Sequence, residues 1–165
     1  MEKEFVGKTK NGITIVVDLE NSHAATHIAD SPQLLPLLKE VISNLESMHD
    51  CQRFEINMGR EIGTSDLVET DEYDDIVYAK RPNRDLYSRF VKNKKPIPTS
   101  WITLELKEVD DQTYEIFTAY IGRITPPFPG NTFETTESKA FWGKHALAWG
   151  KQEIVVGSET TVSPW

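Results

Sequence analysis

The fold is decided by residues 101–121, which read WITLELKEVDDQTYEIFTAYI. Apolar and polar residues alternate on both sides of Asp110 and Asp111, as expected where side chains of a strand point alternately to opposite faces of a sheet. The two aspartates supply the polar break that a turn needs. This stretch therefore predicts an antiparallel hairpin with one buried face.

Further strands are expected on the N-terminal side of this hairpin. The alternation returns at residues 53–58, and β-branched side chains are concentrated at residues 13–19 and again at residues 76–79. Residues 11–12 are an Asn-Gly turn signal, which predicts that the strand after it forms a hairpin with a short segment around Phe5.

Helical spacing appears in three places. Apolar side chains recur over residues 34–48, which predicts a helix whose regular part begins at Pro36, because a proline inside a helix clashes with the preceding turn. Residues 84–91 carry side chains four apart that fit one or two helical turns. A last helix is expected between Thr135, or the threonine after it, and Gly150.

The order of these elements predicts an α+β fold. We expect a single domain over residues 1–165, with a twisted antiparallel sheet on which a leading helix and a C-terminal helix pack. Residues 152–156 are expected to add an edge strand to this sheet. The composition, with 38% hydrophobic and 27% charged residues, is that of an ordinary globular domain.

Composition and absent motifs also narrow the function. No apolar run is long enough to cross a bilayer, the N-terminal residues lack the pattern of a signal peptide, and the lone Cys51 fits a reducing compartment, so we expect a cytoplasmic protein without a membrane partner. The chain has no GxxxxGK[ST], HExxH, CxxC or GxSxG pattern, and we expect neither a metal nor a cofactor. The oligomeric state is left open.

The charge is distributed unevenly. The chain carries 18 basic and 26 acidic side chains, a net charge of −8, yet residues 80–95 hold seven of the basic ones and a single acidic one. Arginines and lysines interleaved with Tyr87 and Phe90 are able to hold phosphates while a ring stacks on a base. The alternative is a solvated face that balances the acidic stretch just before it. That stretch consists of Asp66, Glu69, Asp71, Glu72, Asp74 and Asp75.

The chain has four histidines, two of which are candidates for chemistry. His23 and His27 lie four apart in a small, polar segment, where the alternatives are an ordinary loop, a shared metal and proton transfer near neutral pH. His145 stands among aromatic residues and is expected to be packed and hydrogen-bonded rather than catalytic. His49 follows the first predicted helix, where a cation is favourable at a helix C-terminus.

The second strand of the hairpin offers hydroxyl groups. Strict alternation predicts that Thr118 and Tyr120 share a face with Tyr114 and Ile116, while Phe117 and the residues alternating with it form the other, apolar face. A basic segment and one histidine over that face would complete a metal-free site for cleaving a phosphodiester. Alternatively, threonine and tyrosine are there because they are good strand formers.

These features resemble a family of metal-independent bacterial ribonuclease toxins, the barnase, EndoU, colicin and RelE group and the ribonuclease A-like toxin domains. The resemblance is carried by Arg81 and Arg84 ahead of the hairpin, by Thr118-Ala119-Tyr120 near the end of a strand, and by histidines close to the first helix. It implies a leading helix on a twisted antiparallel sheet and cleavage of RNA without metal. The net charge of −8 departs from the family, whose members are usually basic.

Two functional hypotheses follow. In the first, the protein is an RNA-cleaving or phosphate-binding enzyme, in which arginines hold the backbone, a histidine transfers protons and two hydroxyls orient the phosphate. In the second, it is a non-catalytic acidic module of the inhibitor or immunity type, whose carboxylates at residues 66–75 steer a basic protein partner. The first assigns catalysis to His23, His27, Arg84, Thr118 and Tyr120, and substrate binding to Arg81, Tyr87 and Arg89.

Overall fold

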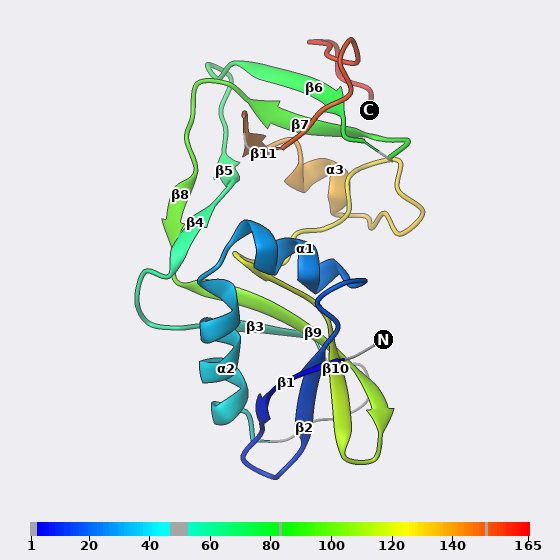
Figure 1. Ribbon diagram of the computed structural model, residues 1–165. Helices are drawn as coiled ribbons and strands as arrows, with labels where there is room; N and C mark the ends of the chain where they lie inside the picture. Colours follow the sequence, from blue (N-terminus) through cyan, green and yellow to red (C-terminus); the bar gives the residue numbers. More distant parts are fainter. Residues whose placement is uncertain (1–2, 47–52, 83, 151) are drawn as a thin grey trace. The chain divides into compact units, whose positions relative to one another are not determined.

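The computed structural model describes residues 3–46, 53–82, 84–150 and 152–165 (Figure 1). The chain divides into two compact units. Unit 1 comprises Met1–Ile62 and Ser100–Arg123, and unit 2 comprises Gly63–Thr99 and Ile124–Trp165. The expectation of a single domain stays a prediction, because such a division does not tell whether the two units unfold together.

Three helices and eleven strands within the described residues confirm the α+β class, with strands predominating. The expectation of one antiparallel sheet is wrong. The strands form three sheets of five, four and two strands, and two of their pairings are parallel. None of the described helices is long and apolar enough to cross a membrane.

Unit 1 contains the predicted hairpin in a five-stranded sheet. The hairpin and the pairing of the first two strands are confirmed. One strand of the N-terminal pair also lies parallel to the second strand of the hairpin, which joins the two hairpins into one sheet. Its strands follow the order β1 (Glu4–Lys8), β2 (Thr14–Val17), β10 (Thr113–Ile121), β9 (Trp101–Asp110) and β3 (Arg53–Asn57).

Helix α1 (His23–Asp30) lies where a polar loop was the leading expectation. Ser22 caps it, because its hydroxyl accepts a hydrogen bond at 3.0 Å from the amide of Ala25. The small residues of this segment allow the helix to approach β10, against which α1 packs. A local cap and a packed face together outweigh the polar composition.

Helix α2 (Leu34–Asn44) confirms the strongest helical pattern, but it begins before Pro36 rather than at it. Pro36 is the third residue of the helix, and amides of the first turn have no partner inside a helix, so the missing N–H costs nothing there. The part of the pattern that reaches Met48 lies outside the described residues. One core joins α1, α2 and one face of the sheet, with Leu38, Leu104 and Ile116 fully buried in it.

Unit 2 contains the other two sheets. Its four-stranded sheet has the order β5 (Leu67–Glu69), β11 (His145–Ala148), β7 (Tyr87–Val91) and β6 (Ile76–Lys80). A two-stranded sheet pairs β4 (Gly63–Ser65) with β8 (Ile97–Thr99). Strand β6 was predicted, but the helical turns expected over residues 84–91 are wrong. That segment pairs with β6 on one side and with β11 on the other, so sheet hydrogen bonds replace the helical spacing.

The C-terminal helix is also shorter than predicted. Helix α3 (Ser138–Phe141) has four residues, and the segment from His145 onward is strand β11. Pairing with β5 and β7 buries Ala146 and Ala148 on one side, which an isolated helix at this position would leave exposed. The predicted strand at residues 152–156 is absent. The tail instead follows the edge of β6, through hydrogen bonds from Val155 to Lys80 and in both directions between Tyr78 and Thr160.

Candidate functional site

The predicted catalytic residues His23, His27, Thr118 and Tyr120 all belong to unit 1, on helix α1 and strand β10. The ring of His27 lies 5.7 Å from that of Tyr120, and the ring of His23 lies 5.7 Å from that of Phe117. The spacing of four places both histidines on one side of α1, as a helix requires. The structure therefore brings an imidazole to one of the two predicted hydroxyl-bearing residues.

A β-bulge changes which face carries the hydroxyls. The pairing of β10 with β9 shifts register between Ile116 and Thr118, so Phe117 has no partner of its own. Beyond the bulge Ala119 is buried in the core together with Ile116. The expectation that Thr118 and Tyr120 share a face with Ile116 is therefore wrong, because the bulge turns them to the opposite side. Strict alternation in the sequence cannot reveal an inserted residue.

Burial keeps both groups of the His27 and Tyr120 pair neutral at physiological pH. Burial lowers the pKa of His27, an effect that Asp30 opposes and His23 reinforces. Burial raises the pKa of the Tyr120 hydroxyl, and a hydrogen bond with Thr103 opposes the rise. A neutral imidazole is able to accept a proton, and a protonated phenol is able to donate a hydrogen bond.

Polar residues of β3 and β9 surround Tyr120 on its face of the sheet. Thr103 is opposite Tyr120 in the register, is 1% exposed and donates a hydrogen bond at 2.8 Å to the carbonyl of Gly122. Arg53 pairs with Glu105 at 3.3 Å, and the charges of both act on Tyr120. The sequence reasoning missed these residues, although the alternation of β3 and β9 places them on the polar face and could have identified them.

Arg81 of unit 2 is held in place by a ring and a hydroxyl. Its guanidinium carbon lies 5.7 Å from the centre of the Phe128 ring, and its Nε donates a hydrogen bond at 3.0 Å to the Ser88 hydroxyl. Phe128 in turn stacks on Trp142 at 3.9 Å. Burial, assisted by the charge of Arg84, lowers the pKa of Arg81 to about 10, so the guanidinium stays charged at neutral pH.

The other predicted binding residues do not lie together in one site. Arg84 is exposed in the turn between β6 and β7, near enough for its charge to act on Arg81. Arg89 lies buried next to Ser88 in β7, and because neighbouring residues of a strand point to opposite faces, it does not join Arg81. Tyr87 lies two residues before Arg89 in β7. The Lys80 ammonium nitrogen lies over the Tyr87 ring, 5.3 Å from the ring centre. These arginines and the histidines of α1 belong to different units, so their convergence stays a prediction.

The acidic stretch at residues 66–75 is partly used inside unit 2. The carboxylate of Asp74 accepts a hydrogen bond at 2.8 Å from the amide of Asp71, and it pairs with Lys94 at 3.2 Å. These bonds, the amide first, hold the pKa of Asp74 below its ordinary value. Asp71, Glu72 and Asp75 are exposed. The steering surface of the second hypothesis therefore consists of fewer carboxylates than the sequence offers.

The two remaining histidines differ in outcome. His145 is packed and hydrogen-bonded, as predicted: its ring stacks on that of Phe141 at 4.1 Å, and Nδ1 lies 3.0 Å from the Phe141 carbonyl oxygen. The prediction for His49 lies outside the described residues. In the part of the chain that the structure describes, no three His, Cys, Asp or Glu side chains come together as metal ligands would.

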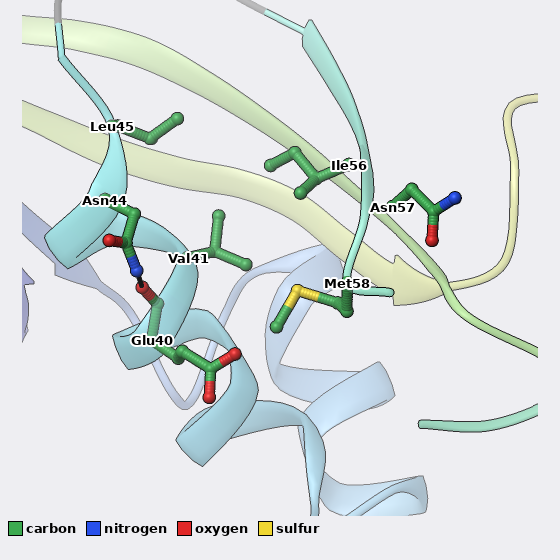
Figure 2. Close-up of a pocket in the computed structure, with 7 residues that line it drawn as sticks. All are labelled: Glu40, Val41, Asn44, Leu45, Ile56, Asn57 and Met58. Carbon is green, nitrogen blue, oxygen red and sulfur yellow. Dashed lines mark hydrogen bonds between the residues drawn. The ribbon is translucent and has the colours of Figure 1, made fainter. Parts of the chain in front are cut away.

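A groove of about 270 Å³ lies between α2 and β3 in unit 1 (Figure 2). Val41, Leu45 and Ile56 form its apolar walls, and the side-chain amide of Asn44 donates a hydrogen bond at 2.9 Å to the carbonyl of Glu40 on its rim. None of the predicted site residues lines this groove.

Comparison with known proteins found no relative of this chain. No family model matches the chain, and neither a curated protein nor a solved structure matches it. The function of the site is therefore argued from its residues alone.

Proposed function

We propose that the protein binds a phosphate-bearing ligand, RNA in the first place, through the turn between β6 and β7, and that it cleaves RNA without a metal. The observation that carries the binding is a pair of neighbouring guanidinium groups, those of Arg81 and Arg84. Neither takes part in any ion pair between described residues. Two adjacent positive charges are stabilised by an anion, and guanidinium groups match the geometry of phosphate oxygens.

The support of Arg81 by a ring and a hydroxyl prepares its guanidinium group to bind a phosphate. Phe128 and Ser88 hold its guanidinium group in one position, so little conformational entropy is lost when a phosphate binds. Arg84 is exposed, and its guanidinium group contacts a second phosphate of the RNA in this proposal. Binding of this kind depends on phosphates rather than on base sequence, and it weakens as salt increases.

Cleavage is assigned to the residues of α1 and β10. The neutral imidazole of His27 removes the proton of a ribose 2′-hydroxyl, and the freed oxygen bonds to phosphorus as the bond from phosphorus to the 5′-oxygen breaks. The 5′-oxygen takes up a proton that His23 donates. Thr118 and Tyr120 orient the phosphate through their hydroxyl groups. The burial of His27, which keeps the imidazole neutral, supports its role as the base.

The test is an RNA assay with the full chain. Binding of a fluorescent single-stranded RNA is measured by anisotropy at several salt concentrations, and its degradation is followed with and without EDTA from pH 5 to pH 8. Loss of one phosphate contact in Arg84→Ala should weaken binding several-fold and lower the salt slope by about 1. Lys139→Ala, which removes an exposed cation of the same unit, is the matched control and should bind like the parent.

Cleavage should survive EDTA and be lost in His27→Gln, while RNA binding is retained. Equal affinities of the Arg84→Ala and Lys139→Ala variants would overturn the binding site. Failure of the pure protein to cleave any RNA over this pH range would overturn the assigned activity.

The second candidate is the acidic module that binds a basic protein. It is favoured by Tyr73, whose side chain is 85% exposed between the exposed Asp71, Glu72 and Asp75. Tyrosine is enriched in the energetic centres of protein interfaces, and surrounding carboxylates accelerate encounter with a basic surface. A chain that neither binds nor cleaves RNA in the assay above would favour this second function.

A further inference from the structure

A second groove, of about 530 Å³, lies in unit 2 beside strands β5 and β11. Its apolar part consists of Leu67, Val68 and Ile97. Its polar part consists of Glu69, Lys94, Lys95 and His145. Apolar walls with a few converging polar groups are typical of sites for small molecules. None of the residues assigned to RNA binding or cleavage lines this groove.

His145 enters this groove with a fixed orientation. The Phe141 carbonyl oxygen can only accept a hydrogen bond, so the contact of 3.0 Å places a proton on Nδ1 of His145. Stacking on the Phe141 ring, which is tilted by only 6°, holds the imidazole in place. The other nitrogen, Nε2, lies 4.0 Å from a carboxylate oxygen of Glu69, which also lines the groove. Nε2 is therefore the atom that His145 offers to a ligand.

The two lysines of the groove differ in whether their charge is already paired. Lys94 donates a hydrogen bond at 2.8 Å to the carbonyl of Glu69 and pairs with the carboxylate of Asp74 at 3.2 Å, so its charge is balanced. Lys95 is exposed, and it takes part in no ion pair within residues 3–46, 53–82, 84–150 and 152–165. Its ammonium group is available to an anion.

A buried cation lies against the backbone of the same wall. Arg89 is 8% exposed, and its Nη1 donates hydrogen bonds at 3.0 Å to the His145 carbonyl and at 2.9 Å to the Thr70 hydroxyl. Its Nε is buried without a hydrogen-bond partner, and none of the ion pairs in the described part of the chain neutralises it. Buried charges are normally paired, so the positive potential here favours an anion nearby.

We propose that this groove binds a small phosphate monoester that carries an apolar or aromatic group. The apolar group lies over Leu67 and Ile97, and the phosphate oxygens reach the Lys95 ammonium group and Nε2 of His145. Because the Phe141 carbonyl already takes the proton on Nδ1, Nε2 can donate a hydrogen bond to a phosphate oxygen only when it also carries a proton. Glu69 opposes binding through its own negative charge, but its side chain is 88% exposed and can turn into solvent.

Under this proposal, Lys95 and Glu69 have opposite effects on the affinity for the phosphate. Removing the ammonium group in Lys95→Gln should weaken binding of phenyl phosphate about fivefold, the effect of one exposed ionic contact. Removing the competing carboxylate in Glu69→Gln should strengthen it. Both side chains are exposed, so neither variant should impair folding. Lys92→Gln is the matched control, because it removes the same charge from a lysine that lies over the Trp149 ring instead of the groove.

The experiment is isothermal titration calorimetry of the full chain at pH 7 in two buffers that differ in ionisation enthalpy. Phenyl phosphate should bind roughly tenfold more tightly than inorganic phosphate because its ring covers the apolar part of the groove, and phenol should not bind. The parent chain should take up protons on binding, and His145→Gln should abolish this uptake. The other charged groups at this wall are Glu69, Lys94, Lys95, Asp74 and Arg89.

Three results would overturn the proposal. One is an equal loss of affinity in Lys95→Gln and Lys92→Gln, and another is proton uptake that persists in His145→Gln. The third is benzoate binding as tightly as phenyl phosphate, which would assign the groove to carboxylates. The proposal is independent of the RNA function, since Arg84→Ala should leave phenyl phosphate binding unchanged while it weakens RNA binding.

Discussion

The six arginines of the chain differ between the two units in whether a carboxylate neutralises their charge. In unit 1, Arg53, Arg60 and Arg123 each form an ion pair with a glutamate. In unit 2, Arg81, Arg84 and Arg89 form none with any described residue. Aromatic rings, hydroxyls and carbonyls hold Arg81 and Arg89 instead. A net charge of −8 therefore says little about local potential, and the arginines on which the proposed phosphate binding rests are those of unit 2 that no described carboxylate neutralises.

The interiors of the two units also differ. Unit 1 has one apolar core shared by two helices and the sheet. The described part of unit 2 has two small apolar clusters, which include Val91 and Phe90, and aromatic contacts around Trp142, which stacks on Phe128 and meets Phe141 edge to face. A small apolar core provides less stabilisation by burial, so individual rings matter more in unit 2.

The largest expected effect comes from removing a ring of unit 2. Trp142 is 1% exposed, stacks on Phe128 at 3.9 Å and donates a hydrogen bond at 3.0 Å to the Pro126 carbonyl. Trp142→Ala should lower the free energy of unfolding by roughly 3–5 kcal/mol, because a large buried side chain is lost and a cavity remains. Urea unfolding followed by circular dichroism measures this.

Phe133→Ala is the control for this variant, because Phe133 is an aromatic residue of the same unit that is exposed. It should change the stability by less than about 0.5 kcal/mol. Calorimetry of Trp142→Ala also tests the predicted single domain. A single transition that shifts as a whole means that both units unfold together, and a shift of one of two transitions would contradict the single domain.

A smaller effect is expected at the cap of α1 in unit 1. Ser22→Ala removes the hydroxyl that accepts the amide hydrogen of Ala25, and it should destabilise the protein by about 1 kcal/mol. Ser43→Ala removes an exposed hydroxyl from within α2 and serves as the matched control. Equal unfolding midpoints of the two variants would show that the cap does not hold α1, and with it His27, in place.

The smallest effect is a dependence of stability on pH. Burial holds the pKa of folded His27 below its ordinary value of 6.5, so the unfolded chain binds a proton more readily. This contribution to stability is complete above pH 6.5 and is lost as the pH falls below it. Thermal unfolding between pH 7.5 and pH 5.5 should show a falling midpoint, and His27→Gln should flatten the decline. An unchanged slope in His27→Gln would contradict the burial of this imidazole.

Much of unit 1 could be predicted from its sequence. The hairpin of β9 and β10, the pairing of β1 with β2, strand β3 and helix α2 all follow from local periodicity. Alternating or helical spacing was sufficient there because each element buries one face against a single core. Helix α1 was missed because its side toward the core offers only Ala24 and Ile28, which carry little hydrophobic signal.

Unit 2 was predicted less well, for a physical reason. Strands β7 and β11 pair on both sides. Strand β7 is also buried along almost its whole length, so it lacks a regular polar face, and β11 has only four residues in which to show a pattern. The four-residue spacing of Leu86 with Phe90 fits a helix and a buried strand equally well. Only the pairing of the strands decided between them, and β7 and β5, the partners of β11, are both distant from it in the sequence.

The candidate sites show the same division. The residue types were evident in the sequence: clustered cations at residues 80–95, hydroxyls at Thr118 and Tyr120, and two histidines four apart. The bulge at Phe117, the burial of Arg89 and the groove around His145 were not, because each depends on how strands pair.

The sequence alone determined the α+β class, the hairpin at residues 101–121 and the concentration of basic residues before it. Short-range periodicity and composition are enough for these features, since they depend on neighbours within a few residues. Strand partners, the bulge, and the choice of which arginines find a carboxylate were decided by the tertiary structure alone. Strand pairing and ion pairs join residues beyond the reach of a local pattern, up to 112 positions apart for Lys3 and Glu115. No local pattern specifies which of several possible partners will be nearest.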